Sequence, residues 1–227
     1  MSPPSLTLCF DLDGTLVNTA PDLFNALDHS LEQFGHPKPD HTPIRPIIGQ
    51  GAKAMQKKAL AQFANTPPSS EELNEMWQTM IDHYAANIAE ESHPYEGVIA
   101  VLKALKSAGH RTAICTNKPM FLTEPLLNTL NMTQHFDVIT SADSYPFKKP
   151  DPRTLWETIK KAGGTPEHAL MIGDSKTDID TARNANIPVI GVTFGYTETP
   201  IDALAPDKIM SNYQELPELI EALFPAN

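Results

Sequence analysis

The sequence lacks the features that would place it in several large protein classes. There is no basic excess: 17 Lys and Arg stand against 28 Asp and Glu in 227 residues, a net charge of −11. A duplex-binding protein usually carries such an excess. No apolar run reaches the roughly 18 residues that a membrane-spanning helix needs. These absences predict no nucleic-acid partner and no membrane span.

Cysteine is also scarce. Cys9 and Cys115 both lie within apolar runs, which favours buried free thiols over a disulfide or a redox pair. The first ten residues lack the basic and long apolar segments of a signal peptide, so we predict a cytoplasmic protein. With 41% apolar and 20% charged residues the composition is globular. The length predicts one large domain with an insertion, or two unequal domains.

Short apolar runs alternate with amphipathic segments over most of the chain. Strands are predicted at residues 6–10, 111–115, 136–140, 169–172 and 188–191, and helices at residues 98–108, 121–130, 152–162 and 176–185. This alternation is typical of βαβ units. It predicts an α/β fold with a doubly wound parallel sheet.

Residues 17–92 follow a different pattern, with helices predicted at residues 20–34, 51–63 and 71–90. In the last of these, the apolar residues recur at steps of three and four, the period of one helix face. The block is therefore predicted to be all helical, with no strand of its own. We expect it to be an insertion just after the first strand. Residues 1–16 and 93–227 would then form the α/β core.

Four polar clusters follow predicted strands. They are Asp11-Leu-Asp13-Gly-Thr15, Thr116-Asn117, Lys148-Lys149-Pro150, and Gly173-Asp174 through Asp178. In an open α/β sheet, residues just past the carboxyl ends of the strands share one crevice. We therefore expect these four clusters to meet around one ligand.

The residue types in this crevice indicate phosphoryl chemistry. Asp11, Asp13 and Asp174 would repel one another without a cation, and oxygen ligands favour Mg²⁺ over Zn²⁺. The Thr116 hydroxyl, the Lys149 ammonium and that cation suit a doubly charged phosphate.

One carboxylate of the first cluster is predicted to attack phosphorus and form an aspartyl phosphate. The second carboxyl, two residues on, is predicted to exchange protons with the leaving oxygen and with water. Because Gly14 allows a turn, we expect Asp13 to offer its backbone carbonyl to the metal and its side chain to the leaving group. Simpler interpretations exist: Asp-Gly pairs mark ordinary turns, and Asp174 and Asp178 could be first-turn helix acids.

The four clusters, in this order, resemble the motifs of the haloacid dehalogenase-like phosphatases, and more closely those of the phosphoglycolate phosphatase group. The resemblance spans roughly residues 6–210. It implies a Rossmann-like core with a helical cap, residues 17–92, inserted after the first motif. It also implies Mg²⁺ as the cofactor.

The resemblance also implies roles for individual residues. Asp11 would be the nucleophile and Asp13 the general acid and base, while Thr116 and Lys149 would hold the phosphoryl group. The metal ligands would be Asp11, Asp13 and Asp174. Asp178 would stand behind them, orienting Lys149 or a metal-bound water. The motifs further predict that Asn117 contacts the substrate, and that Lys149 rather than Lys148 is the phosphate lysine because it precedes Pro150.

The predicted function is Mg²⁺-dependent hydrolysis of a small phosphomonoester, first of all 2-phosphoglycolate. Another phosphatase, acting on a sugar phosphate, nucleotide or pyrophosphate, and a sugar-phosphate mutase remain alternatives. A dehalogenase, a phosphonate hydrolase and a receiver-type domain are disfavoured. The non-enzymatic alternative is a phosphate-ligand sensor, but that should lack Asp11, Asp13 or Lys149, and all three are present. The predicted partner is a small phosphorylated metabolite, bound by a monomer or a homodimer.

The helical insertion is predicted to act as a lid that reads the leaving group, because the four clusters contact only the phosphoryl group. Within it, Arg45 lies beside an irregular, glycine-containing stretch. Its guanidinium is predicted to pair with a substrate carboxylate. The competing interpretation is a solvated arginine at a helix end.

Overall fold

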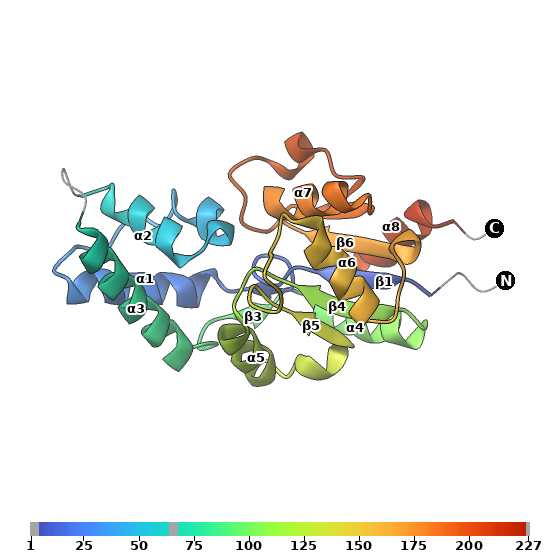
Figure 1. Cartoon of the computed structure of the whole chain (residues 1–227), viewed down its shortest axis with the longest axis horizontal. Helices are drawn as coiled ribbons and strands as arrows, with labels where there is room; N and C mark the ends of the chain where they lie inside the picture. Colours follow the sequence, from blue (N-terminus) through green and yellow to red (C-terminus); the bar gives the residue numbers. More distant parts are fainter. Residues whose placement is uncertain (1–4, 64–67, 226–227) are drawn as a thin grey trace.

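A six-stranded parallel sheet forms the centre of the computed structural model, which describes residues 5–63 and 68–225 (Figure 1). Across the sheet the strands are β5 (Val138–Thr140), β4 (Arg111–Cys115), β1 (Thr7–Phe10), β6 (Ala169–Gly173), β7 (Val189–Val192) and β8 (Lys208–Met210). The first strand in sequence therefore lies inside the sheet, between β4 and β6. The α/β class with a parallel sheet, predicted from the sequence, is confirmed.

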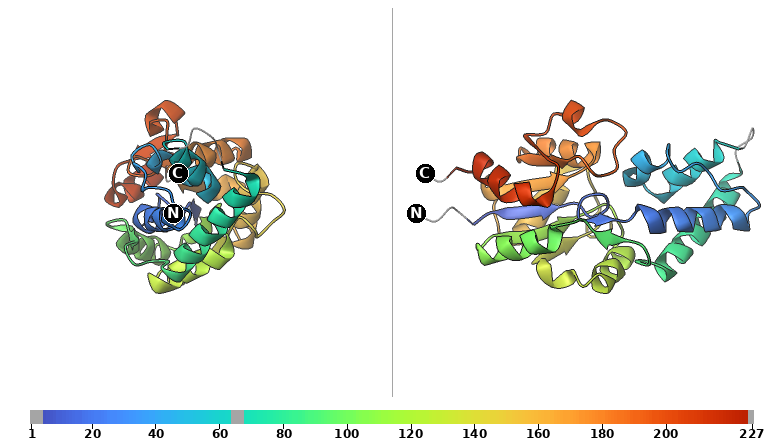
Figure 2. Two further views of the ribbon diagram at one scale, coloured as in Figure 1. Left: turned by 90° about the vertical axis from the view of Figure 1, so that its left-hand side faces the viewer. Right: turned by 180° about the vertical axis from the view of Figure 1, so that it is seen from behind.

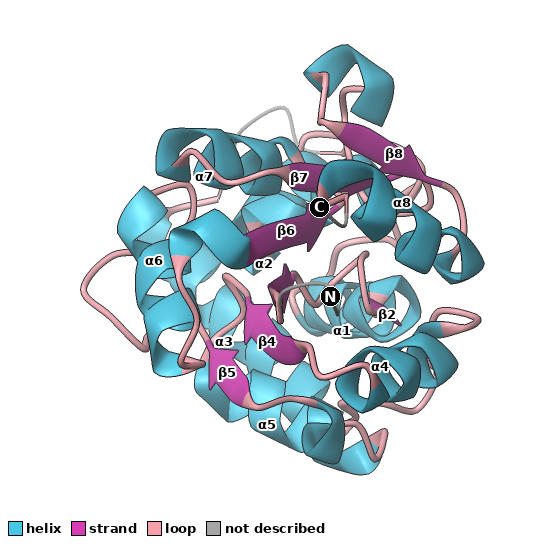
Figure 3. Ribbon diagram, turned by 90° about the vertical axis from the view of Figure 1, so that its right-hand side faces the viewer, coloured by secondary structure: helices cyan, strands magenta, loops and turns pink. Residues whose placement is uncertain are grey.

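Helices cover both faces of the sheet, as the view in Figure 3 shows. On one face lie α4 (Val98–Ser107) and α8 (Leu216–Leu223), and on the other lie α6 (Pro152–Lys161) and α7 (Lys176–Ala185). Successive side chains of a strand point to opposite faces. Thus Leu8 and Phe10 join one buried apolar cluster, whereas Cys9 joins the other. This burial on both faces explains why the strands are apolar runs.

A further helix and several short 3₁₀ helices belong to the core. They are α5 (Met120–Thr129) and the 3₁₀ helices η2 (Thr133–His135), η3 (Pro166–His168), η4 (Ile201–Leu204) and η5 (Tyr213–Glu215). None of the helices in the described ranges combines the length and apolar character needed to cross a bilayer.

The inserted segment forms a helical lobe at the end of the molecule opposite the two termini (Figures 1 and 2). It contains α1 (Ala20–Gln33), η1 (Arg45–Gln50), α2 (Ala52–Leu60) and α3 (Ser70–Ala86). We call this lobe, residues 17–92, the cap. The apolar stripe of α3 is buried in it, as the sequence pattern predicts. The carboxyl end of β1 points toward the cap, so residues that follow this strand face it.

The structure differs from the predicted elements in several places. The two crossings between core and cap pair as an antiparallel ribbon of β2 (Val17–Asn18) and β3 (His93–Pro94), so the inserted block is not wholly helical. Helix α3 ends at Ala86 rather than near residue 90. The elements β8 and α8 were not predicted. The two-residue strands β2 and β3 are too short to leave a period in the sequence, and their pairing is set by distant chain segments.

Candidate active site

The ends of neighbouring strands bring the predicted polar clusters together. Asp11 directly follows β1, Thr116 follows β4, and Asp174 follows β6. Since β4 and β6 flank β1 in register, these three residues come from adjacent strand ends. Lys149 reaches the same place from the segment that precedes α6. Residues separated by more than a hundred positions therefore line one crevice, as predicted from the strand order.

Lys149, not Lys148, reaches the carboxylates. The side chain of Lys149 is buried, and its Nζ lies 2.8 Å from Asp11 Oδ1 and 2.6 Å from Asp178 Oδ1. Burial opposes its positive charge, but Asp11 and Asp178 outweigh that effect and raise the pKa of Lys149 above its ordinary value. Lys149 is therefore a fixed cation. Lys148 is exposed and lines the outer part of the cavity described below.

Three carboxylates converge beside Lys149. Oxygens of Asp11, Asp174 and Asp178 lie within 4.8 Å of one another, and the three side chains are buried. Burial, opposed by Lys149 and reinforced by Asp178, raises the pKa of Asp11 from 3.8 to about 6. Burial, with Asp178 and Asp11 adding to it, raises the pKa of Asp174 well above its ordinary value. The cluster therefore holds more negative charge than one lysine neutralises.

The partners of these carboxylates separate their roles. Both oxygens of Asp178 accept hydrogen bonds. One accepts from Lys149, and the other accepts from the backbone N–H and the hydroxyl of Ser175 at 3.0 and 2.7 Å. Asp174 accepts from the Thr15 hydroxyl at 3.1 Å and from the backbone N–H of Tyr196 at 2.5 Å. Asp178 thus orients Lys149, whereas Asp11 keeps an oxygen that accepts no bond from the described residues.

The donor set fits a hard divalent cation. Among the described residues, the possible metal ligands that converge here are carboxylate oxygens, with no His or Cys, and Mg²⁺ prefers such ligands. Three buried carboxylates against one ammonium leave about two negative charges in excess, which a divalent ion would balance. Sequence analysis predicted Asp13 in this set. Its side chain is not part of the converging group, although its backbone carbonyl was the predicted ligand atom.

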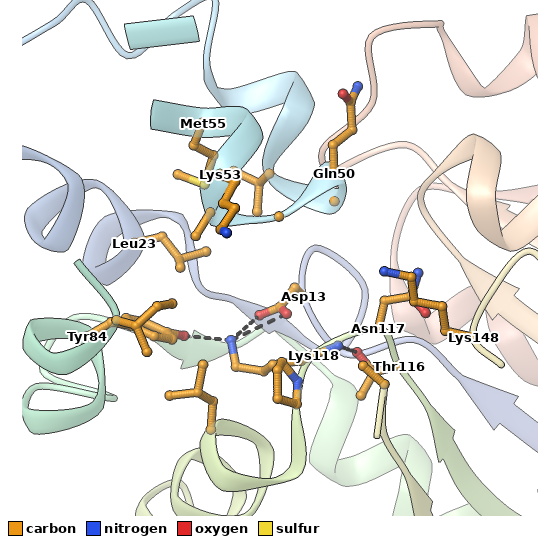
Figure 4. Close-up of a pocket in the computed structure, with 18 of the residues that line it drawn as sticks. Asp13, Leu23, Gln50, Lys53, Met55, Tyr84, Thr116, Asn117, Lys118 and Lys148 are labelled. Atoms are coloured by element: carbon orange, nitrogen blue, oxygen red, sulfur yellow. Dashed lines mark hydrogen bonds and ion pairs between the residues drawn. The ribbon is translucent and has the colours of Figure 1, made fainter. Parts of the chain in front are cut away.

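Asp13 and Asp11 pair with different lysines. Gly14 adopts φ +83°, a left-handed turn that suits glycine, and a Cβ there would lie 2.5 Å from an Asp174 oxygen. Just before this turn the Asp13 carboxylate lies 3.0 Å from Lys118 Nζ, which also donates to the Tyr84 hydroxyl at 2.8 Å (Figure 4). The sequence did not single out Lys118 or Tyr84. The one available signal was the position of Lys118, two residues after Thr116.

A cavity of about 370 Å³ lies between the core and the cap. Its core side carries Asp11, Asp13, Thr116 and Lys118, as Figure 4 shows in part. Its cap side is largely apolar and is formed by Leu23, Ile48, Met55, Trp77 and Ile81. A cavity with polar side chains on one wall and apolar side chains on the other is typical of a small-molecule site.

The other predicted residues lie in different places. Thr116 lines the cavity, and its hydroxyl accepts from the backbone N–H of Lys118 at 3.1 Å. Asn117 also lines it and donates to the backbone carbonyl of Lys149 at 3.0 Å. Arg45 is exposed and is not among the residues lining this cavity. Its guanidinium stacks 4.9 Å above the Tyr196 ring, between the cap and the core.

Comparison with known proteins places this site in a family. Residues 8–192 match the haloacid dehalogenase-like hydrolases. The chain is 43% identical over 222 residues to the phosphoglycolate phosphatase of Agrobacterium fabrum, covering 97% of this chain and 95% of that protein. It is 42% identical over 227 residues to the phosphoglycolate phosphatase of Mesorhizobium japonicum, covering 100% and 99%.

Solved structures agree with the sequence relatives. The crystal structure of a predicted phosphoglycolate phosphatase from Haemophilus somnus 129PT superimposes with a TM-score of 0.88 at 30% identity. That similarity covers 95% of this chain and 97% of the other.

Proposed function

The chain belongs to the haloacid dehalogenase-like hydrolase family and is a phosphatase, and we propose that its substrate is 2-phosphoglycolate, hydrolysed to glycolate and inorganic phosphate. Relatives that carry this name over nearly the whole chain support the proposal. The observation that carries it is the arrangement of the site. A buried group of carboxylates around Lys149 opens into a cavity that Asp13 and Lys118 face.

In the first half of the reaction we assign Asp11 as the nucleophile. One of its oxygens forms a bond to phosphorus while the bond from phosphorus to the glycolate oxygen breaks, which leaves an aspartyl phosphate. Asp13 donates a proton to the departing oxygen. Lys149 and Thr116 hold the other phosphoryl oxygens, and Lys149 is already fixed between Asp11 and Asp178 for this purpose.

In the second half, Asp13 acts as the general base. It takes a proton from a water molecule whose oxygen attacks the phosphorus of the aspartyl phosphate. The bond from phosphorus to the Asp11 oxygen breaks, which restores the carboxylate and releases inorganic phosphate. Because the cap covers the cavity, its apolar side chains limit the number of water molecules that reach the intermediate.

Mg²⁺ is the proposed cofactor, held by Asp11, Asp174 and the backbone carbonyl of Asp13, with Asp178 behind them. Its support is the excess negative charge of the buried carboxylates and their all-oxygen character. When bound, the ion supplies positive charge that offsets the charge of the phosphoryl oxygens. Without it, Lys149 would be the one cation among the described residues at this site to offset the charge of the dianion that Asp11 approaches.

Further predictions from the sequence stay proposals. Residues 17–92 are proposed to form a cap domain that selects the leaving group, on a core of residues 1–16 and 93–227. Asn117 is proposed to contact the substrate, which its place in the cavity wall supports. The predicted role of Arg45 in binding a carboxylate has no such support. A cytoplasmic location agrees with two buried free cysteines, and the protein is proposed to act as a monomer or homodimer.

A phosphate-release assay tests the function. The purified protein is given Mg²⁺ and 2-phosphoglycolate, a sugar phosphate, a nucleotide or pyrophosphate, each with and without excess chelator. The proposal expects the highest kcat/KM for 2-phosphoglycolate, lost in chelator. A higher kcat/KM for any of the other phosphate compounds would overturn the substrate assignment. Exchange of phosphate between sugar positions, dependent on a bisphosphate, would instead indicate a mutase.

A further inference from the structure

Lys118 is a buried cation that the phosphoryl chemistry leaves without a role. Its side chain is 4% exposed and lines the cavity, and its hydrogen bonds go to Asp13 and Tyr84 rather than to Asp11 or Asp178. Its Nζ lies 3.0 and 3.4 Å from the two oxygens of Asp13 and donates to the Tyr84 hydroxyl at 2.8 Å (Figure 4). A buried ammonium is costly to desolvate, so its position calls for an explanation.

One hydrogen-bond donor at this position, the Tyr84 hydroxyl, has no acceptor among the described residues. The three protons of the Lys118 ammonium face the two Asp13 oxygens, at 3.0 and 3.4 Å, and the Tyr84 hydroxyl, at 2.8 Å. The Tyr84 hydroxyl accepts from Lys118, so its own proton remains available. Around them the cap wall offers the apolar side chains of Leu23 and Ile81. A free hydroxyl proton beside a buried ammonium, both facing the cavity, favours a ligand that brings an acceptor, preferably an anion.

The position of Lys118 along the path of the leaving group indicates which acceptor this is. Asp13 is the residue proposed to protonate the ester oxygen, and Lys118 lies within hydrogen-bond distance of Asp13. In 2-phosphoglycolate the carboxylate carbon is two bonds, about 2.5 Å, from that oxygen. A substrate carboxylate therefore falls within reach of the Lys118 ammonium when the ester oxygen is at Asp13.

We propose that Lys118 and Tyr84 together form the binding site for the carboxylate of the leaving group, so that they determine specificity. The proposal rests on the proposed function, and it moves the role predicted for Arg45 to a different cation. Arg45 is exposed and stacks on Tyr196, whereas Lys118 is already inside the cavity. Because Lys118 belongs to the core and Tyr84 to α3 of the cap, a bound carboxylate bridges the two lobes.

The test compares two esters that differ only in the carboxylate. Lys118→Met is assayed with 2-phosphoglycolate and with 2-hydroxyethyl phosphate, in which a neutral CH₂OH replaces the carboxylate. The substitution also removes the Lys118 hydrogen bond to Asp13, but that loss slows both reactions alike. The ratio of the two kcat/KM values therefore isolates the carboxylate contact. We expect this ratio to fall on the order of 100-fold from its wild-type value, the effect of one charge-assisted hydrogen bond.

Three further variants sharpen the assignment. Lys118→Arg keeps the charge and should restore part of the ratio. Tyr84→Phe removes only the hydroxyl, so it tests the site even if Lys118→Met fails to fold, and it should lower the ratio about 10-fold. Lys53→Met removes another lysine of the cavity wall, which instead contacts Asn74 and Trp77. It should leave the ratio unchanged.

The outcomes separate this inference from the proposed function. If wild-type protein does not prefer 2-phosphoglycolate, the proposed function fails. If it does, but Lys118→Met and Tyr84→Phe slow both esters equally, the carboxylate site is wrong and the function stands. A fall in the ratio for Arg45→Ala alone would return the role to Arg45. A fall for Lys118→Met and Tyr84→Phe, with none for Lys53→Met, supports the proposal.

Discussion

Replacing Asp11 with asparagine should stabilise the metal-free protein while it abolishes turnover. The reason is the excess of buried negative charge around Lys149. Burial raises the pKa of Asp11 from 3.8 to about 6, so the folded protein favours the protonated acid more than the unfolded chain does. The stability that comes from the protonated form is full below about pH 4 and is lost as the pH rises through about 6. Asparagine is neutral at every pH in this range.

The size of the effect follows from the pKa values. A rise from 3.8 to about 6 corresponds to about 3 kcal/mol of lost stability once the acid is ionised. For a chain of this length, 1 kcal/mol moves the melting temperature by about 2–4 °C. In chelator at pH 7.5, Asp11→Asn should therefore melt roughly 6 °C or more above the wild type. The gain should shrink at pH 5, where the wild-type acid is largely protonated.

The measurement is thermal unfolding by circular dichroism at both pH values, with phosphate release measured in parallel. Turnover with Mg²⁺ should fall more than about 100-fold, because an amide is a poor nucleophile. Asp151→Asn is the matched control, since it replaces a partly exposed helix-capping carboxylate, outside the buried cluster, by an equally good cap. It should change neither quantity. A variant that melts no higher than the wild type in chelator would refute the charge argument, and one retaining over about a hundredth of the rate would refute the nucleophile.

Three other perturbations address the metal, the packing around Asp174 and the hydrogen bonds that Asp22 accepts. Activity should require Mg²⁺ and be poorly supported by Ca²⁺, which prefers longer bonds and more ligands; full activity in excess chelator would contradict the metal assignment. Gly195→Ala places a Cβ 2.1 Å from that of Asp174, so the Mg²⁺ concentration for half-maximal activity should rise, and an unchanged value would argue against Asp174 as a ligand. The buried Asp22 carboxylate accepts bonds from Glu91 and Ser92. Asp22→Asn should lower the urea-measured free energy of unfolding by about 2 kcal/mol, and no loss would mean that these bonds contribute little.

The elements predicted from the sequence are those that carry their own periodicity. Strands buried on both faces read as apolar runs, and the stripe of α3 repeats at the helical period. The ribbon of β2 and β3 has no such signal, because two residues on each side pair only when both ends of the cap meet. The same holds for β8 at the sheet edge, a strand of three residues of which Ile209 is exposed and Met210 is buried.

The predicted site residues were those fixed by the sheet itself. Asp11, Thr116 and Asp174 each follow a strand, so parallel order was enough to bring them together. The pair of Lys118 and Tyr84 was not accessible, because their contact depends on where α3 lies relative to the core. Arg45 was singled out for the irregular backbone beside it. Irregular backbone indicates only that a ligand could approach, and here an aromatic ring of the core occupies the guanidinium face.

The dimensions of the cavity indicate how such a site would discriminate. The cavity volume of about 370 Å³ exceeds the volume of 2-phosphoglycolate, which has about nine non-hydrogen atoms. This holds even if each of those atoms is given the volume of a whole water molecule in the liquid, about 30 Å³. Shape alone would therefore admit larger esters. Selection must then come from polar groups placed at fixed distances from the ester oxygen, and the apolar cap wall makes each unpaired donor expensive. It follows that Lys118 and Tyr84 select partly by exclusion, because an ester that lacks a carboxylate there leaves the Tyr84 hydroxyl without an acceptor beside the buried ammonium.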